Sequence, residues 1–98
     1  MARLTKMEKF RAKIDIEMDH VRAALIELRA KAKEVKLDTR VSIEKSLDAL
    51  EKNQGDVRSK LDEWAKAGKD AAGELQKTIK RSTKELRKSV KKAYKSLT

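Results

Sequence analysis

The apolar residues in the first third of the chain recur at alternating steps of three and four. The stripe runs from Leu4 to Val35 with one gap, at Arg11. Five of its members lie seven residues apart: Met7, Ile14, Val21, Leu28 and Val35. A seven-residue repeat places an apolar seam on one side of a helix, where a neighbouring helix packs. The pattern therefore predicts a helix with a buried seam over residues 4–35.

A second apolar series, over residues 43–64, includes Ile43, Leu50 and Trp64. It begins eight residues after Val35 instead of seven, so the phase changes within residues 36–42. Asp38, Thr39 and Ser42 are each able to act as an N-cap there. This segment is either a turn or a skip within a continuous helix, and the lack of Gly and Pro favours the skip.

Two other segments could reverse the chain. Residues 53–56, Asn-Gln-Gly-Asp, tolerate turn geometry, although the seven-residue spacing runs through them. Residues 66–70 contain Gly68, and Gly73 follows; each Gly in a helix costs about 1 kcal/mol relative to Ala. We expect one of the segments 36–42, 53–56 and 66–70 to fold the chain into a helical hairpin.

The last third, residues 64–98, has an eleven-residue period. Trp64, Leu75, Leu86 and Leu97 are eleven apart, and so are Gly68, Ile79 and Val90. Eleven residues in three turns keep an apolar stripe nearly straight along a helix. The change of period predicts a helix that packs against its neighbours in a different geometry from the first two thirds of the chain.

These patterns predict an all-α fold: long helices forming a coiled-coil hairpin or an elongated bundle, in one domain over residues 1–98. Charged residues make up 43% of the chain and Pro is absent, which favours long helices over a conventional compact core. Because a lone two-helix hairpin buries little apolar area, we expect a homo-oligomer. The predicted packing seam comprises Met7, Ile14, Met18, Val21, Leu25, Leu28, Val35, Ile43, Leu47, Leu50, Val57, Leu61, Trp64, Leu75, Ile79 and Leu86.

The positive charge is concentrated near the C-terminus. The chain has 26 Lys and Arg against 16 Asp and Glu, a net charge of +10 that favours an anionic partner. Between residues 77 and 95 the only acid is Glu85. The bases there are the candidate anion-binding residues Lys77, Lys80, Arg81, Lys84, Arg87, Lys88, Lys91, Lys92 and Lys95.

This basic segment has three interpretations. Leu75, Ile79, Leu86, Val90 and Leu97 form a narrow apolar stripe, with the bases on the sides and back of the helix. The arrangement suits anionic lipid headgroups, with Tyr94 as the one aromatic anchor, or the phosphates of nucleic acid. It also suits a solvated face on a helix whose stripe packs internally. With few aromatics to stack bases, nucleic-acid binding is expected to be electrostatic and independent of sequence.

Three segments carry a resemblance to a known family: MEKFRAKIDIEMDHVRAALIELRAKAKE, IEKSLDALEKNQGDVRSKLDEW and AAGELQKTIKRSTKELRKSVKKAYK. With these the chain resembles small bacterial, mainly proteobacterial, coiled-coil proteins of uncharacterised function, over most of its length. The resemblance implies a cytoplasmic helical protein with no catalytic residues. This chain departs from the family's usual acidic character, and it has Ala72 and Thr83 where relatives usually carry Trp.

The sequence contains few features that would support catalysis or metal binding. Glu17 and His20 have the Glu-x-x-His spacing of di-iron bundles, but they lie beside the buried stripe. There is no Cys, the Ser and Thr residues lack a plausible general-base partner, and there is no Gly-rich phosphate loop. Trp64 is expected in the core, with an exposed partner contact as the alternative. We therefore expect no enzyme activity, cofactor, metal or small-molecule substrate.

The sequence predicts a non-enzymatic, cytoplasmic coiled-coil module that self-associates and presents a basic helix. Two alternatives use that same helix, namely sequence-independent nucleic-acid binding and peripheral binding to an anionic membrane. No signal peptide is evident, and no apolar run approaches the roughly 20 residues of a membrane span.

Overall fold

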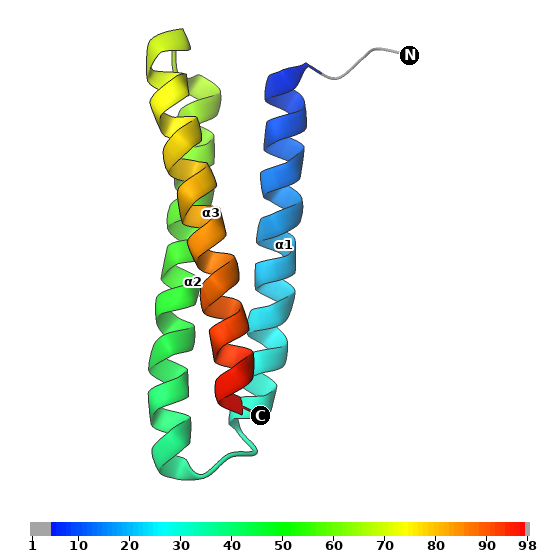
Figure 1. Cartoon of the computed structure of the whole chain (residues 1–98), viewed down its shortest axis with the longest axis vertical. Helices are drawn as coiled ribbons and strands as arrows, with labels where there is room; N and C mark the ends of the chain where they lie inside the picture. Colours follow the sequence, from blue (N-terminus) through cyan, green and yellow to red (C-terminus); the bar gives the residue numbers. More distant parts are fainter. Residues whose placement is uncertain (1–4, 98) are drawn as a thin grey trace.

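Three long helices lie side by side in an elongated bundle (Figure 1). The computed structural model describes residues 5–97, apart from the side chains at positions 69 and 70. Helix α1 spans Lys6–Ala32, α2 spans Leu37–Lys66 and α3 spans Lys69–Leu97. Each helix runs antiparallel to the next, over principal extents of 50 × 29 × 16 Å. The all-α elongated bundle is confirmed, whereas a hairpin with one reversal is wrong because the chain reverses twice.

The first reversal occupies residues 33–36, so the favoured skip within a continuous helix is wrong. The backbone N–H of Glu34 donates to the C=O of Lys31 at 3.0 Å as α1 ends. Val35 is half-buried and packs against the core. Packing of apolar residues, and not Gly or Pro, therefore sets this turn. The N-cap of α2 is Lys36, and the predicted caps at 38, 39 and 42 lie inside the helix.

The second reversal lies within the predicted segment 66–70. The N–H of Ala67 donates to the C=O of Trp64 at 3.2 Å where α2 ends. Gly68 directly precedes α3, and its C=O accepts from the N–H of Ala72 at 2.9 Å. Residues 53–56, by contrast, are helical throughout, so the polar segment there is not a turn.

The start of α1 is fixed by Thr5, whose Oγ1 accepts from the N–H of Glu8 at 3.1 Å. This is the capping arrangement that Thr-x-x-Glu favours. Met7 lies in the first turn and is 48% exposed, so it is not part of the core of the bundle, and its place in an oligomer seam stays a prediction. The core begins one turn later, at Phe10, which sequence reasoning missed. Leu4 lies outside the described residues.

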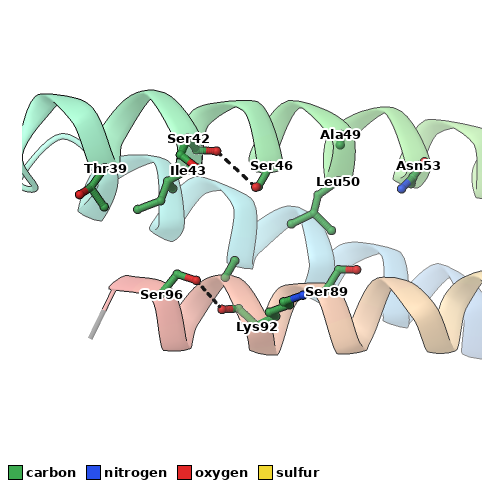
Figure 2. Close-up of a pocket in the computed structure, with 11 residues that line it drawn as sticks. Thr39, Ser42, Ile43, Ser46, Ala49, Leu50, Asn53, Ser89, Lys92 and Ser96 are labelled. Carbon is green, nitrogen blue, oxygen red and sulfur yellow. Dashed lines mark hydrogen bonds between the residues drawn. The ribbon is translucent and has the colours of Figure 1, made fainter.

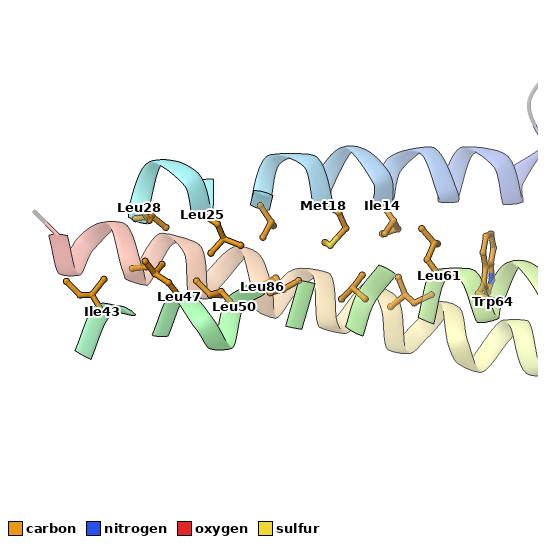
Figure 3. Packing of buried hydrophobic residues seen from close by; sticks show 14 of the residues in the cluster. Ile14, Met18, Leu25, Leu28, Ile43, Leu47, Leu50, Leu61, Trp64 and Leu86 are labelled. Carbon is orange, nitrogen blue, oxygen red and sulfur yellow. The ribbon is translucent and has the colours of Figure 1, made fainter. Parts of the chain in front are cut away.

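All three helices contribute to one continuous core (Figure 3). The rings of Phe10 and Trp64 meet edge to face near one end, with centroids 4.9 Å apart. Val35 and Leu75 of the predicted seam are half-buried against this core. The fully buried seam residues are Ile14, Met18, Val21, Leu25, Leu28, Ile43, Leu47, Leu50, Val57, Leu61, Trp64, Ile79 and Leu86. Helix α3 thus covers apolar faces that a two-helix hairpin would leave open.

Candidate anion-binding face

Helix α3 turns its apolar stripe inward and nine bases outward. Ile79 and Leu86 are buried in the core, and Val90 and Leu97 pack against it. Because successive helical residues are rotated by about 100°, the bases between these positions point to solvent. The resulting basic face consists of Lys77, Lys80, Arg81, Lys84, Arg87, Lys88, Lys91, Lys92 and Lys95, all of them exposed. At 1.5 Å per residue it is about 27 Å long.

The net charge of the bundle is concentrated in α3. That helix has ten Lys and Arg against three Asp and Glu, whereas α2 has six against seven. The bases and acids of α1 and α2 nearly balance, and four of their twelve acids pair across the seam between these two helices. Arg29 binds Asp48 at 3.0 Å and Glu51 at 2.7 Å, and Arg58 binds Asp19 at 3.2 Å. The α1–α2 side is therefore nearly neutral, and the α3 side is strongly positive.

Few acids neutralise the basic face. Arg87 Nε lies 3.5 Å from Glu17 Oε2 of α1, and Lys95 also has an interaction. Among the described residues, the other seven bases have no acidic side chain within ion-pair distance. Exposed cations at this density attract polyanions, whose condensed counterions are released on binding.

A shallow groove between α1 and α3, of about 280 Å³, continues the basic face. Lys80, Lys84 and Arg87 line it from α3, and Lys13 lines it from α1. The Nζ of Lys80 lies 5.9 Å from the centroid of the Phe10 ring, a cation–π distance. Sequence reasoning missed Lys13 because only the packing of α1 on α3 brings it to this face.

A hydrogen bond from Tyr94 links the C-terminal end of α3 to α1. The Tyr94 hydroxyl donates to Glu27 Oε2 at 2.8 Å, and Lys31 Nζ lies 3.3 Å from Glu27 Oε1. Lys31 Nζ is also 5.5 Å from the centroid of the Tyr94 ring. The hydrogen bond from Tyr94 lowers the pKa of Glu27, and the same bond raises the pKa of Tyr94. The side chain considered as a membrane anchor instead joins two helices of the bundle.

A larger groove, of about 520 Å³, lies between α2 and α3 (Figure 2). Small polar side chains line both walls, including Ser42 and Ser46 on α2 and Ser89 and Ser96 on α3. The hydroxyls of Ser46 and Ser96 donate to backbone carbonyls one turn earlier, at 3.3 and 3.1 Å. Lys92 is the one charged residue in the lining. The groove offers much less charge than the outer surface of α3.

The remaining candidates do not form a site. Glu17 pairs with Arg87, while His20 is exposed. Among the side chains that the structure describes, no group of three or more His, Cys, Asp or Glu is placed to hold a metal ion. Trp64 is buried, which excludes its alternative role as an exposed partner contact. In that same part of the chain, no helix has the length and apolar character needed to cross a membrane.

Comparisons with known proteins give no match to this chain, whether with family models, curated proteins or solved structures. The resemblance to proteobacterial coiled-coil proteins therefore stays a prediction.

Proposed function

We propose that this protein is a non-enzymatic helical module that binds duplex nucleic acid along the basic face of α3. The main support is the concentration of nine exposed bases on one helix, seven of them without an ion-pair partner among the described residues. Lys and Arg that neutralise phosphates release condensed counterions, and this release drives binding at moderate salt.

Binding to this face is expected to be independent of base sequence. Seven of the nine bases are Lys, whose ammonium is a point charge without the fixed bidentate geometry of Arg. No Asn or Gln, the residues that pair with adenine edges, belongs to the face. A track of about 27 Å along one helix suits contact with phosphates, which position a protein on a duplex but carry no base sequence.

Membrane binding is a weaker candidate for this face. An interfacial helix inserts its apolar stripe among lipid chains. In α3 that stripe is already used, since Ile79 and Leu86 are buried against α1 and α2. Insertion of α3 would therefore require the bundle to open, whereas electrostatic binding of phosphates leaves it intact.

The expectation of an obligatory homo-oligomer rests on a two-helix hairpin, which buries too little apolar area to be stable alone. In this fold a third helix gives a single chain a continuous core. The predicted seam residues are used inside that core, with Met7 as the exposed exception. A scaffold that self-associates is thus a separate proposal and needs a different surface.

The test compares two triple variants that lower the net charge equally. One variant replaces three lysines of α3 with Gln, at Lys84, Lys88 and Lys91. The other replaces three lysines of α2 with Gln, at Lys45, Lys52 and Lys66. All six side chains are exposed. Affinity for a mixed-sequence duplex is measured by fluorescence anisotropy from about 50 to 200 mM salt. The α3 variant should reduce the slope of log K against log salt by about 3, and the α2 variant by much less.

Equal losses in the two variants would mean that net charge, and not the basic face, governs binding. Vesicles with and without anionic lipid form the second arm. Binding to anionic vesicles without any binding to duplex would replace nucleic acid with a membrane as the partner. Deleting residues 77–98 is unsuitable as a test, because it removes Ile79 and Leu86 from the core.

A further inference from the structure

Helix α1 carries two seven-residue stripes on opposite sides. The inner stripe is buried in the core and consists of Ile14, Met18, Val21, Leu25, Leu28 and Ala32. A second stripe has the same alternating spacing two residues earlier: Ala12, Ile16, Asp19, Ala23, Ile26 and Ala30. A shift of two residues is a rotation of about 200°, so this outer stripe faces away from the bundle. All six of its residues are exposed.

The outer stripe is more apolar than a solvated helix face requires. Ile16 and Ile26 are 55% and 67% exposed, and Ala occupies three of the other four positions. Asp19 is the one charged member, and its carboxylate pairs with Arg58 of α2 at 3.2 Å. Steps of three and four along a stripe are typical of a seam that packs against another helix.

We propose that this outer stripe is a self-association surface, on which the same stripe of a second copy packs in the antiparallel direction. The stripe is self-complementary when the two helices run in opposite directions. Ile16 then faces Ile26 of the second copy, Ala12 faces Ala30, and Asp19 faces Ala23. A parallel pair would instead place Asp19 against its own copy, an unfavourable like-charge contact.

One flanking pair favours the antiparallel arrangement. On one edge of the stripe Asp15 lies about 3 Å along the axis from Arg29 of the second copy, and Arg29 also pairs with Asp48 and Glu51 of its own chain. On the other edge Lys13 lies midway between Glu27 and Lys31 of the second copy, so that edge adds no preference. Neither Lys13 nor Asp15 has an ion pair among the described residues. Since the stripe is only about 27 Å long, the dimer is expected to be reversible.

The experiment measures mass by light scattering coupled to size exclusion, over a range of protein concentrations up to about 100 µM. The wild type should shift from monomer toward dimer. Ile16→Glu with Ile26→Glu should stay monomeric, with helicity unchanged because both side chains are exposed. Leu37→Glu with Val41→Glu is the matched control, since these side chains are 71% and 47% exposed but belong to α2. A monomeric wild type, or equal loss of dimer in the control, overturns the proposal.

Direction is tested with single cysteines, because the chain has none of its own. Ile16→Cys protein is mixed with mass-tagged Ile26→Cys protein and oxidised. The antiparallel pair predicts the mixed disulfide, since two copies of position 16 are then about 15 Å apart along the axis, too far to bridge. Disulfides between identical positions only, or no disulfide at all, would contradict the proposed packing. This result does not depend on nucleic-acid binding.

Discussion

Gln54 of α2 donates from Nε2 to the backbone C=O of Met18 in α1 at 3.2 Å, and both side chains are buried. A lone amide in an apolar seam contributes little net stability, but it fixes the axial register of two helices. The amide therefore sets how α1 aligns with α2, and indirectly how Arg29 and Arg58 meet their acids.

Two substitutions at Gln54 should show whether its hydrogen bond stabilises the fold. Gln54→Leu keeps the volume without a polar group, and the Met18 carbonyl retains its bond within α1. We expect its free energy of unfolding to be unchanged or raised by up to about 1 kcal/mol. Gln54→Ala leaves a cavity and should lower that free energy by about 1–3 kcal/mol. Urea denaturation measures both, and equal destabilisation would show that the hydrogen bond itself stabilises the fold.

Much of this fold follows from apolar spacing, and the exceptions have local physical causes. The inner stripes and the outward bases of α3 were predictable because helical periodicity alone sets them. Gln54 was not, because a polar residue is buried only when a partner lies across the core, here 36 positions away. The turn at 33–36 lacks Gly and Pro, so the phase change within residues 36–42 was its main sign in the sequence, and that change fits a skip as well as a turn.

The sequence predicts the bases of α3 that form the basic face, but not the residue that α1 adds to it. Charge counts identified residues 77–95, since exposed bases follow from the stripe on α3. Lys13 joins them only through tertiary packing. The contact of Tyr94 was not predictable for a related reason: its partner Glu27 lies on another helix, and the sequence gives no local sign of that hydrogen bond.

The bond between Tyr94 and Glu27 should make stability depend on pH in a defined way. The pKa of Glu27 is lowered from 4.5, so its contribution is present above that value and is lost as pH falls through the lowered pKa. The pKa of Tyr94 is raised from 10.0, so its contribution is lost as pH rises through the raised pKa.

Tyr94→Phe should therefore destabilise the protein most at neutral pH. The difference in unfolding free energy between wild type and variant should shrink at both extremes of pH, and urea titrations at several pH values measure it. Glu44→Gln, which breaks the pair with Arg40 on α2, is the control and should not show the alkaline loss. A difference for Tyr94→Phe that is constant with pH would contradict the assigned bond.

The three glycines should respond differently to Ala. Gly55 and Gly73 lie inside α2 and α3, none has a positive φ, and an added Cβ meets nothing within 4 Å. Gly55→Ala and Gly73→Ala should each raise the free energy of unfolding by about 0.5–1 kcal/mol. Gly68 directly precedes α3, where Ala is a poor N-cap, so Gly68→Ala should be neutral or destabilising. Thermal unfolding of the three variants measures their order of stability.

Thr83 carries a buried hydroxyl with no hydrogen-bond partner among the described residues. Thr83→Val has nearly the same shape and similar helix propensity, and it removes the unpaired polar group. We expect the free energy of unfolding to rise by about 1 kcal/mol. Thr83→Ser keeps the hydroxyl and loses a buried methyl, so it should be destabilising. A loss of stability in Thr83→Val would show that the hydroxyl is satisfied in solution.

Glu17 links the packing of α3 to the proposed function, because its carboxylate in α1 pairs with a member of the basic face, at 3.5 Å from Arg87. Glu17→Gln should free Arg87 for a phosphate and remove a repelling charge from the α1–α3 groove. One additional phosphate contact should raise duplex affinity about threefold at moderate salt and steepen the slope of log K against log salt by about 0.9. Asp62→Asn is the control, since Asp62 pairs with Arg11 at 3.8 Å on the α1–α2 side and the change in net charge is the same. An equal gain in the control would assign the effect to net charge, and a gain in Glu17→Gln alone would place the nucleic acid beside Arg87.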